Sequence, residues 1–203
     1  MDVATRILES LFENISPFPK EEQQIYPRLE ERLNELGRLY QESGKKNMEY
    51  LMEDDGLNHI LTPGRLSVYE SIREKAMRLG VTRVVDIGCA YGHQSEVFLE
   101  VEMDYIGVTD HDSLFWNRDR FDYVIDHYPC PLPLKENDLA ISVLCLTWNC
   151  FLHEKEKTLM EQCEALVKDF SHCILYTDKP EYVANYFKTC ENLGNRLYYF
   201  SNQ

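Results

Sequence analysis

The chain of 203 residues is long enough for one domain with a substantial core and an additional helical segment. A hydrophobic content of 44%, with 12% aromatic residues, is typical of a globular protein and excludes a disordered one. The formal net charge of -14 repels phosphate backbones, so nucleic acid is an unfavourable partner and we expect a small-molecule, cationic or protein partner. The alternative is that the acidic surface serves only solubility.

The cysteines and the opening of the chain indicate a reducing compartment. The seven cysteines are odd in number and lie mostly in apolar segments, at positions 89, 130, 145, 150, 163, 173 and 190. The chain opens on an amphipathic, acid-containing segment and not on a signal peptide. Its longest apolar run, Leu139–Trp148, is too short to span a bilayer. We therefore expect a cytoplasmic protein with reduced thiols.

Residues 1–61 are predicted to form a helical cap. Apolar residues recur at the helical period in Val3–Ile15 and again in Tyr26–Gln41, and Ser16-Pro17-Phe18-Pro19 separates the two segments. Three roles remain open for this cap: a lid over a substrate, a packing appendage, or the interface of a homodimer.

Residues 62–203 are predicted to form an α/β domain with a doubly wound, mostly parallel sheet. A helix is predicted over Arg65–Leu79 and ends at Gly80, and a buried strand follows over Arg83–Ile87. Helical and strand patterns then alternate with short connections, as they do in doubly wound sheets.

The turn after the first strand reads Asp86-Ile87-Gly88-Cys89-Ala90-Tyr91-Gly92. Its two glycines permit backbone angles and close approaches that a Cβ would forbid. The turn leads into a helix predicted over Ser95–Val101, so amide groups at the start of this helix are expected to point at a ligand above the carboxyl end of the strand.

This stretch resembles the first motif of class I S-adenosylmethionine-dependent methyltransferases, an acid-x-Gly-x-Gly-x-Gly loop, with Ala90 in place of the middle glycine. The dinucleotide-binding pattern Gly-x-Gly-x-x-Gly fits less well, because it would need glycine at Ala90 and His93. The resemblance implies that S-adenosylmethionine binds here and leaves as S-adenosylhomocysteine. Cys89 is interpreted as a small packing residue. The implied contacts of the methionine part are Asp86, Gly88, Cys89, Ala90, Tyr91 and Gly92.

The second strand is predicted over Met103–Thr109. In the family, an acid at the end of this strand takes the two ribose hydroxyls, which suit the paired acceptors of a carboxylate. The matching position is Thr109, and an acid, Asp110, follows one residue later. The resemblance therefore implies a ribose site at Thr109, Asp110 and His111. A solvated loop over these residues is the alternative.

Strands are predicted next over Phe121–His127 and Leu139–Leu146. The intervening Leu132-Pro133-Leu134 resembles the corresponding region of small-molecule methyltransferases, in which an acid just before Leu-Pro contacts the adenine amino group. Tyr128 and Cys130 occupy that neighbourhood here, so Asp126 is the candidate substitute. The implied adenine contacts are Asp126, Tyr128 and Leu146.

The end of the chain is predicted as a helix over Glu154–Val167, a strand over His172–Thr177, a helix over Glu181–Leu193 and a last strand over Arg196–Ser201. This prediction contains six strands, whereas the fold implied by the resemblance has seven and ends in an antiparallel hairpin. The seventh strand is therefore predicted to be missing, supplied from elsewhere, or hidden earlier in the chain.

No motif specific to one methyl acceptor is present. Ligands of such sheets bind at the carboxyl ends of strands, so polar side chains there are the candidates for catalysis. Cys145, Cys150 and His153 do not have a recognised zinc spacing, and we predict no metal site. The candidate catalytic residues are His111, Tyr128, Trp148, Asn149 and His153, and each has a structural or solvated alternative.

The function indicated is that of an S-adenosylmethionine-binding protein that methylates a small molecule or a protein. The alternative is a catalytically inactive, acidic binding or regulatory protein that keeps this fold. A nicotinamide-dependent enzyme fits less well.

Overall fold

A computed structural model describes residues 63–90, 92–110, 119–143, 145–146 and 156–202. The chain forms two compact units, residues 1–70 and 71–203, and the sheet lies entirely in the second. The predicted helical cap, residues 1–61, lies outside the described residues, and its boundary stays a prediction. None of the described helices is both long and apolar enough to cross a bilayer.

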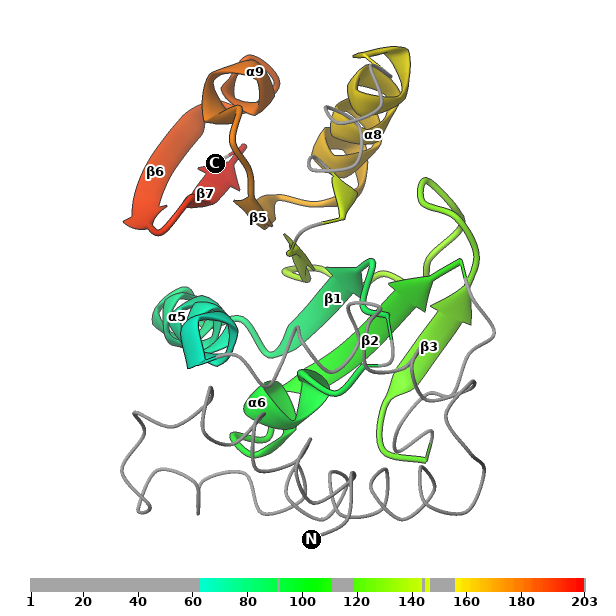
Figure 1. Cartoon of the computed structure of the whole chain (residues 1–203). Coiled ribbons are helices and arrows are strands. Elements are labelled where there is room, and N and C mark those ends of the chain that lie inside the picture. The colour runs from blue at the N-terminus through cyan, green and yellow to red at the C-terminus, as the bar shows by residue number, and fades with distance from the viewer. Residues whose placement is uncertain (1–62, 91, 111–118, 144, 147–155, 203) are drawn as a thin grey trace, which may run out of the picture. The chain divides into compact units, whose positions relative to one another are not determined.

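The second unit contains a seven-stranded sheet in the order β3-β2-β1-β4-β5-β7-β6 (Figure 1). The first five strands are parallel, and β7 runs antiparallel to both β5 and β6. The predicted α/β fold is confirmed, with a mixed sheet. The strands are β1 Arg83–Ile87, β2 Asp104–Thr109, β3 Asp122–Ile125, β4 Leu139–Ser142, β5 His172–Tyr176, β6 Thr189–Gly194 and β7 Leu197–Ser201.

The described helices are α5 Pro63–Arg78, α6 Ser95–Leu99, α8 Glu156–Asp169 and α9 Pro180–Ala184. Helix α8 buries Leu159, Cys163 and Leu166, which recur at helical spacing and therefore form one apolar face. This face belongs to a core cluster with β-strand residues such as Val85 and Cys173. The predicted helix between β4 and β5 is confirmed over most of its length.

The prediction of a helix over residues 181–193 is wrong. Helix α9 ends at Ala184, and Thr189–Gly194 forms the edge strand β6. A tight turn joins β6 to β7, with positive φ angles of 93°, 49° and 64° at Gly194, Asn195 and Arg196. The seventh strand is therefore present, and the chain ends in an antiparallel hairpin. Most of β6 is exposed, so its sequence lacks the apolar alternation that marks a strand with one buried face.

Candidate functional site

The loop after β1 is held in a strained, left-handed conformation. The φ angles are +83° at Gly88, +49° at Ala90 and +72° at Gly92. Ala90, which stands in place of the motif's middle glycine, thus adopts a conformation that residues with a Cβ rarely take. Tyr91 lies outside the described residues. Such strain persists only where the surrounding contacts hold it in place.

Those contacts centre on the carboxylate of Asp86, which is 1% exposed. Its Oδ2 accepts hydrogen bonds from Gln94 Nε2 at 2.7 Å and from Tyr105 Oη at 2.5 Å. Gln94 Nε2 also donates to the carbonyl oxygen of Cys89 at 2.9 Å. The side chain of Gln94 therefore ties the end of β1, the loop and the start of α6 together.

The buried Asp86 makes stability depend on pH. Burial raises the pKa of Asp86 to about 6, because desolvation outweighs the opposing hydrogen bonds from Tyr105 and Gln94. A carboxyl group with a higher pKa in the folded chain binds its proton more tightly there. Its stabilising contribution is therefore complete below the unfolded pKa and is lost as the pH rises to about 6.

We expect Asp86→Asn to remove this dependence, because asparagine keeps an acceptor for Tyr105 and Gln94 but does not titrate. Relative to the variant, the wild type should lose about 3 kcal/mol of unfolding free energy between about pH 4 and pH 7. Urea unfolding of both proteins across this range measures the difference. Parallel stability curves would contradict the prediction.

Side chains of the protein itself fill the space next to the loop glycines. A Cβ on Gly88 would lie 2.2 Å from Cys145 Sγ, and one on Gly92 would lie 2.5 Å from Cζ of Phe121. A Cβ on Gly107 in β2 would lie 2.7 Å from Cys89 Sγ. Cys89 thus packs against β2, and burial raises the pKa of its thiol well above the ordinary value, which keeps it protonated.

Amide groups of the loop and of the start of α6 donate to carbonyl oxygens of the protein, as Ser95 N–H does to the carbonyl oxygen of Gly92 at 3.0 Å. The N–H groups of Gly88 and Cys89 both donate to the carbonyl oxygen of Val108, at 2.8 and 3.1 Å, and Gly92 N–H donates to the carbonyl oxygen of Cys89. These three amides bind the protein's own carbonyl oxygens and do not point at a ligand. The bonds to Val108 hold the loop against the end of β2.

The structure brings the ends of the first three strands to one edge of the sheet. Ile87 pairs with Val108, and Thr109 pairs with Ile125, so the loop, Asp110 and Asp126 all follow carboxyl ends at this edge. The side chain of Asp110 is 53% exposed, and its Oδ2 lies 4.0 Å from His127 Nδ1. Thr109 is buried, and its carbonyl oxygen accepts from the N–H of Asp126.

The fourth strand ends earlier than predicted, because Ser142 turns the chain. Its Oγ donates to the carbonyl oxygen of Ile87 at 2.8 Å and accepts from the N–H of Leu146 at 3.2 Å. Leu146, predicted to lie in the strand and to contact adenine, is 3% exposed and follows the strand at the same edge. Ser142 therefore joins the end of β4 to the end of β1.

Tyr128 is placed differently from the other candidates. It is buried in the core beneath α8, and its hydroxyl donates to Asp169 Oδ2 at 3.3 Å. Asp169 is the last residue of α8, just before β5 begins, so this hydroxyl lies toward the amino edge of the sheet. Burial raises the pKa of Tyr128 above its ordinary value. His111, Trp148, Asn149 and His153 lie outside the described residues.

Sequence reasoning missed three residues that shape this site: Gln94, Tyr105 and Cys145. The sequence did indicate Gln94 and Tyr105, because a buried acid at the end of a strand requires hydrogen-bond donors. Both side chains carry such donors and lie close to Asp86 in the chain. No local pattern indicated that Cys145 lies against Gly88.

No protein-family model matches the chain, and neither does any curated protein. Solved structures do match. Monomeric WbdD, a bifunctional kinase-methyltransferase, aligns with a TM-score of 0.55 at 18% identity, over 68% of this chain and 41% of WbdD. The N-methyltransferase NodS from Bradyrhizobium japonicum WM9, in complex with S-adenosyl-L-homocysteine, aligns with a TM-score of 0.52 at 13% identity, over 69% of this chain and 88% of NodS.

The chain thus spans about two fifths of the length of WbdD. At sequence identities of 18% and 13%, the structural similarity to these proteins establishes the fold alone. The chain therefore shares an α/β fold with the methyltransferases WbdD and NodS.

Proposed function

We propose that the chain binds S-adenosylmethionine along the carboxyl ends of β1, β2 and β3 and methylates a small molecule or a protein. The observation that supports this proposal is the strained loop at the end of β1, which the hydrogen bonds of the buried Asp86 hold in place. The strand order reverses between β1 and β4, and ligands of open α/β sheets bind where the order reverses.

The described residues at this edge fit the cofactor in one respect above all. Asp110 presents a half-exposed carboxylate just past the end of β2, and its two oxygens suit a pair of adjacent ribose hydroxyls. The loop from Gly88 to Gly92 would lie under the methionine part, and Asp126 would lie near the adenine. NodS, which has this fold, was solved with S-adenosyl-L-homocysteine.

When bound, S-adenosylmethionine supplies an activated methyl group, so the protein needs little covalent machinery. This chain's residues would hold the acceptor in line with the sulfonium and exclude water. A general base is needed only if the acceptor must lose a proton. His111, Trp148, Asn149 and His153 follow strands β2 and β4 in the chain and remain the candidates for contact with the acceptor.

A second function is favoured by two features of the loop. Cys145 and Phe121 fill the space beside Gly88 and Gly92, and the loop amides bind protein carbonyl oxygens. Packing alone would therefore explain why glycine is required at these positions, without any bound cofactor. The second candidate is thus a catalytically inactive protein that binds a partner through its acidic surface. Cofactor binding separates the two proposals.

Calorimetric titration of the full chain with S-adenosylhomocysteine tests the proposed site. Asp110→Ala is expected to weaken binding about 10- to 100-fold, because hydrogen bonds to a charged group contribute about 1.5–3 kcal/mol. Asp178→Asn, which removes another exposed carboxylate, is the matched control and should leave the affinity unchanged. A folded wild type that binds neither this ligand nor S-adenosylmethionine would refute the enzyme proposal.

A further inference from the structure

The peptide that joins Cys89 to Ala90 lies at the strained point of the loop after β1. Ala90 has φ +49°, a left-handed conformation that is unfavourable for a residue with a Cβ. Rotation of this one peptide plane would return Ala90 to a negative φ angle, because ψ of Cys89 and φ of Ala90 change together in such a flip. The strain therefore favours a second loop conformation, and contacts within the protein must oppose it.

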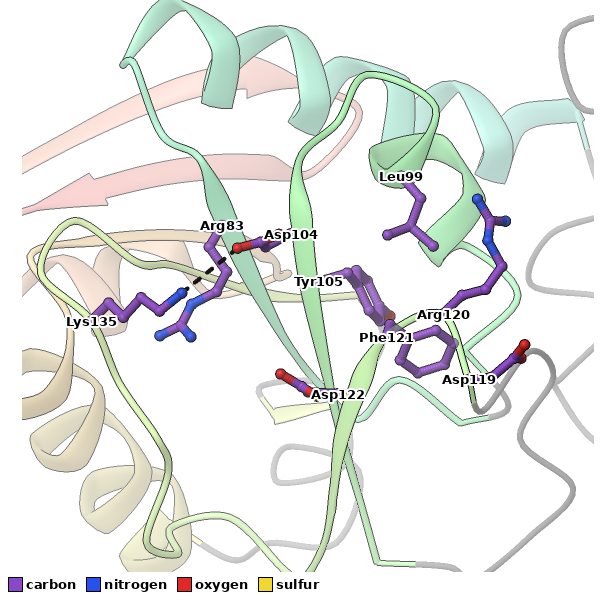
Figure 2. Close-up of a pocket in the computed structure, with 9 residues that line it drawn as sticks. All are labelled: Arg83, Leu99, Asp104, Tyr105, Asp119, Arg120, Phe121, Asp122 and Lys135. Carbon is purple, nitrogen blue, oxygen red and sulfur yellow. Dashed lines mark ion pairs between the residues drawn. The ribbon is translucent and has the colours of Figure 1, made fainter.

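Both ends of the loop are anchored to the rest of the protein. The N–H of Cys89 donates to a carbonyl oxygen of β2 at 3.1 Å. At the other end, a Cβ on Gly92 would lie 2.5 Å from the ring of Phe121, which packs edge to face on Tyr105 with the centroids 5.2 Å apart (Figure 2). A flip of the peptide between Cys89 and Ala90 leaves these anchors in place, so it is a motion that they do not prevent.

The carbonyl oxygen of Cys89 is the group that this flip would move. It accepts hydrogen bonds from Gly92 N–H and from Gln94 Nε2, both at 2.9 Å. Gln94 is 4% exposed, and its Nε2 also donates to Asp86 Oδ2 at 2.7 Å. A flip would turn the oxygen away from both donors. Since one hydrogen bond is comparable in strength to the cost of one left-handed residue, loss of the Gln94 donor would bring the two loop conformations close in energy.

The orientation that Gln94 holds leaves one amide of the loop for a ligand. The peptide is trans, so its C=O and N–H bonds point in opposite directions and Ala90 N–H points away from the buried Gln94 side chain. Ala90 is partly exposed. This N–H donates to no acceptor among the described residues, whereas the N–H groups of Gly88, Cys89 and Gly92 all do. An acceptor on a ligand would therefore complete the hydrogen bonding of the loop.

We propose that Gln94 is a positioning residue of the cofactor site, which locks the peptide between Cys89 and Ala90 so that Ala90 N–H donates to the bound ligand. The inference rests on the proposed function, in which the loop lies under the methionine part of S-adenosylmethionine. The carboxylate is the hydrogen-bond acceptor of that part and is therefore the partner of Ala90 N–H. Gln94 acts through the loop and does not touch the cofactor.

The test is a double-mutant cycle, measured by calorimetric titration of the full chain with S-adenosylhomocysteine. Gln94→Met keeps the length of the side chain but removes its donors, and we expect an affinity about 10-fold lower. In an Ala90→Gly background the left-handed conformation has no steric penalty, so the same change should lower the affinity about 3-fold or less. Gln162→Met, which removes the amide of another buried glutamine in α8, should bind like the wild type.

NMR of the unliganded protein tests the lock without any cofactor. Gln94→Met is expected to give doubled or exchange-broadened amide signals for Ala90 and Gly92, because both loop conformations become populated. The wild type and Gln94→Met/Ala90→Gly are expected to give single signals for the same positions.

An equal loss of affinity for Gln94→Met in both backgrounds would overturn the proposal, because it would show that Gln94 contributes packing alone. Unchanged affinity in Gln94→Met, an equal loss in Gln162→Met, or single wild-type signals in unliganded Gln94→Met would also overturn it. A wild type that binds neither S-adenosylhomocysteine nor S-adenosylmethionine would instead refute the proposed function, and the NMR comparison would then decide the lock by itself.

Discussion

Replacing Gly88 by alanine is expected to lower the free energy of unfolding by about 2–5 kcal/mol. The residue has φ +83°, which costs a side chain about 1–2 kcal/mol, and the new Cβ would lie 2.2 Å from Cys145 Sγ and 2.3 Å from Cys145 Cβ. Forcing an extra carbon into a packed site costs about 1–3 kcal/mol more. Urea unfolding of the wild type and the variant measures the sum.

Gly80 provides the matched control for this experiment. It has φ +69°, but a Cβ there would meet nothing within 4 Å, so Gly80→Ala should cost only the backbone term of about 1–2 kcal/mol. In a Cys145→Gly background, Gly88→Ala should cost no more than that. If Gly88→Ala and Gly80→Ala cost the same in the wild-type background, Cys145 does not pack against the loop.

Replacing Arg83 by leucine is expected to lower the free energy of unfolding by about 3–5 kcal/mol, because it leaves a buried carboxylate without its cation. Asp138 is 4% exposed and accepts two hydrogen bonds from the Arg83 guanidinium and one from the N–H of Lys135. Arg83 also donates to the carbonyl oxygen of Pro133, so the pair joins the start of β1 to the segment before β4. Urea unfolding at neutral pH measures the loss.

Two further variants separate the burial of the charge from the loss of the arginine. Arg83→Leu/Asp138→Leu removes both charges and should recover much of the loss, because a buried ion pair is often replaceable by apolar side chains. Arg78→Ala breaks an ion pair with Glu74 whose side chains are 75% and 61% exposed, and it should cost at most about 1 kcal/mol. Equal costs for Arg83→Leu and Arg78→Ala would show that Asp138 is not buried.

Most strands were predictable from the sequence, including the half-exposed edge strand β3, whereas the edge strand β6 was not. Val84 and Val85 in β1 and Cys173–Tyr176 in β5 are short apolar runs, which is the pattern of a parallel strand with both faces covered. Thr189–Gly194 carries no such run, and hydrogen bonding to β7 makes it a strand. Pairing between segments is a tertiary property that a local pattern does not report.

The candidate site was likewise predictable from the sequence only in part. The motif from Asp86 to Gly92 predicted a turn whose glycines take backbone angles that a Cβ would disfavour, and the positive φ angles of Gly88 and Gly92 confirm this. The motif did not predict that Cys145 fills the space beside Gly88, or that the loop amides donate to Val108. Contacts of this kind join residues far apart in the chain, and only the packed sheet brings them together.

The sequence by itself determined the α/β class and the place of the loop, because hydrophobic periodicity and glycine conformation are local properties of the chain. The tertiary structure decided which carboxylates are buried and which face solvent. Asp86 lies near the end of β1 and Asp110 lies just past the end of β2. Asp86 is buried in the core, whereas the side chain of Asp110 is half exposed. Arg83 and Asp138, 55 residues apart, form a buried pair because β1 and β4 are neighbours in the sheet.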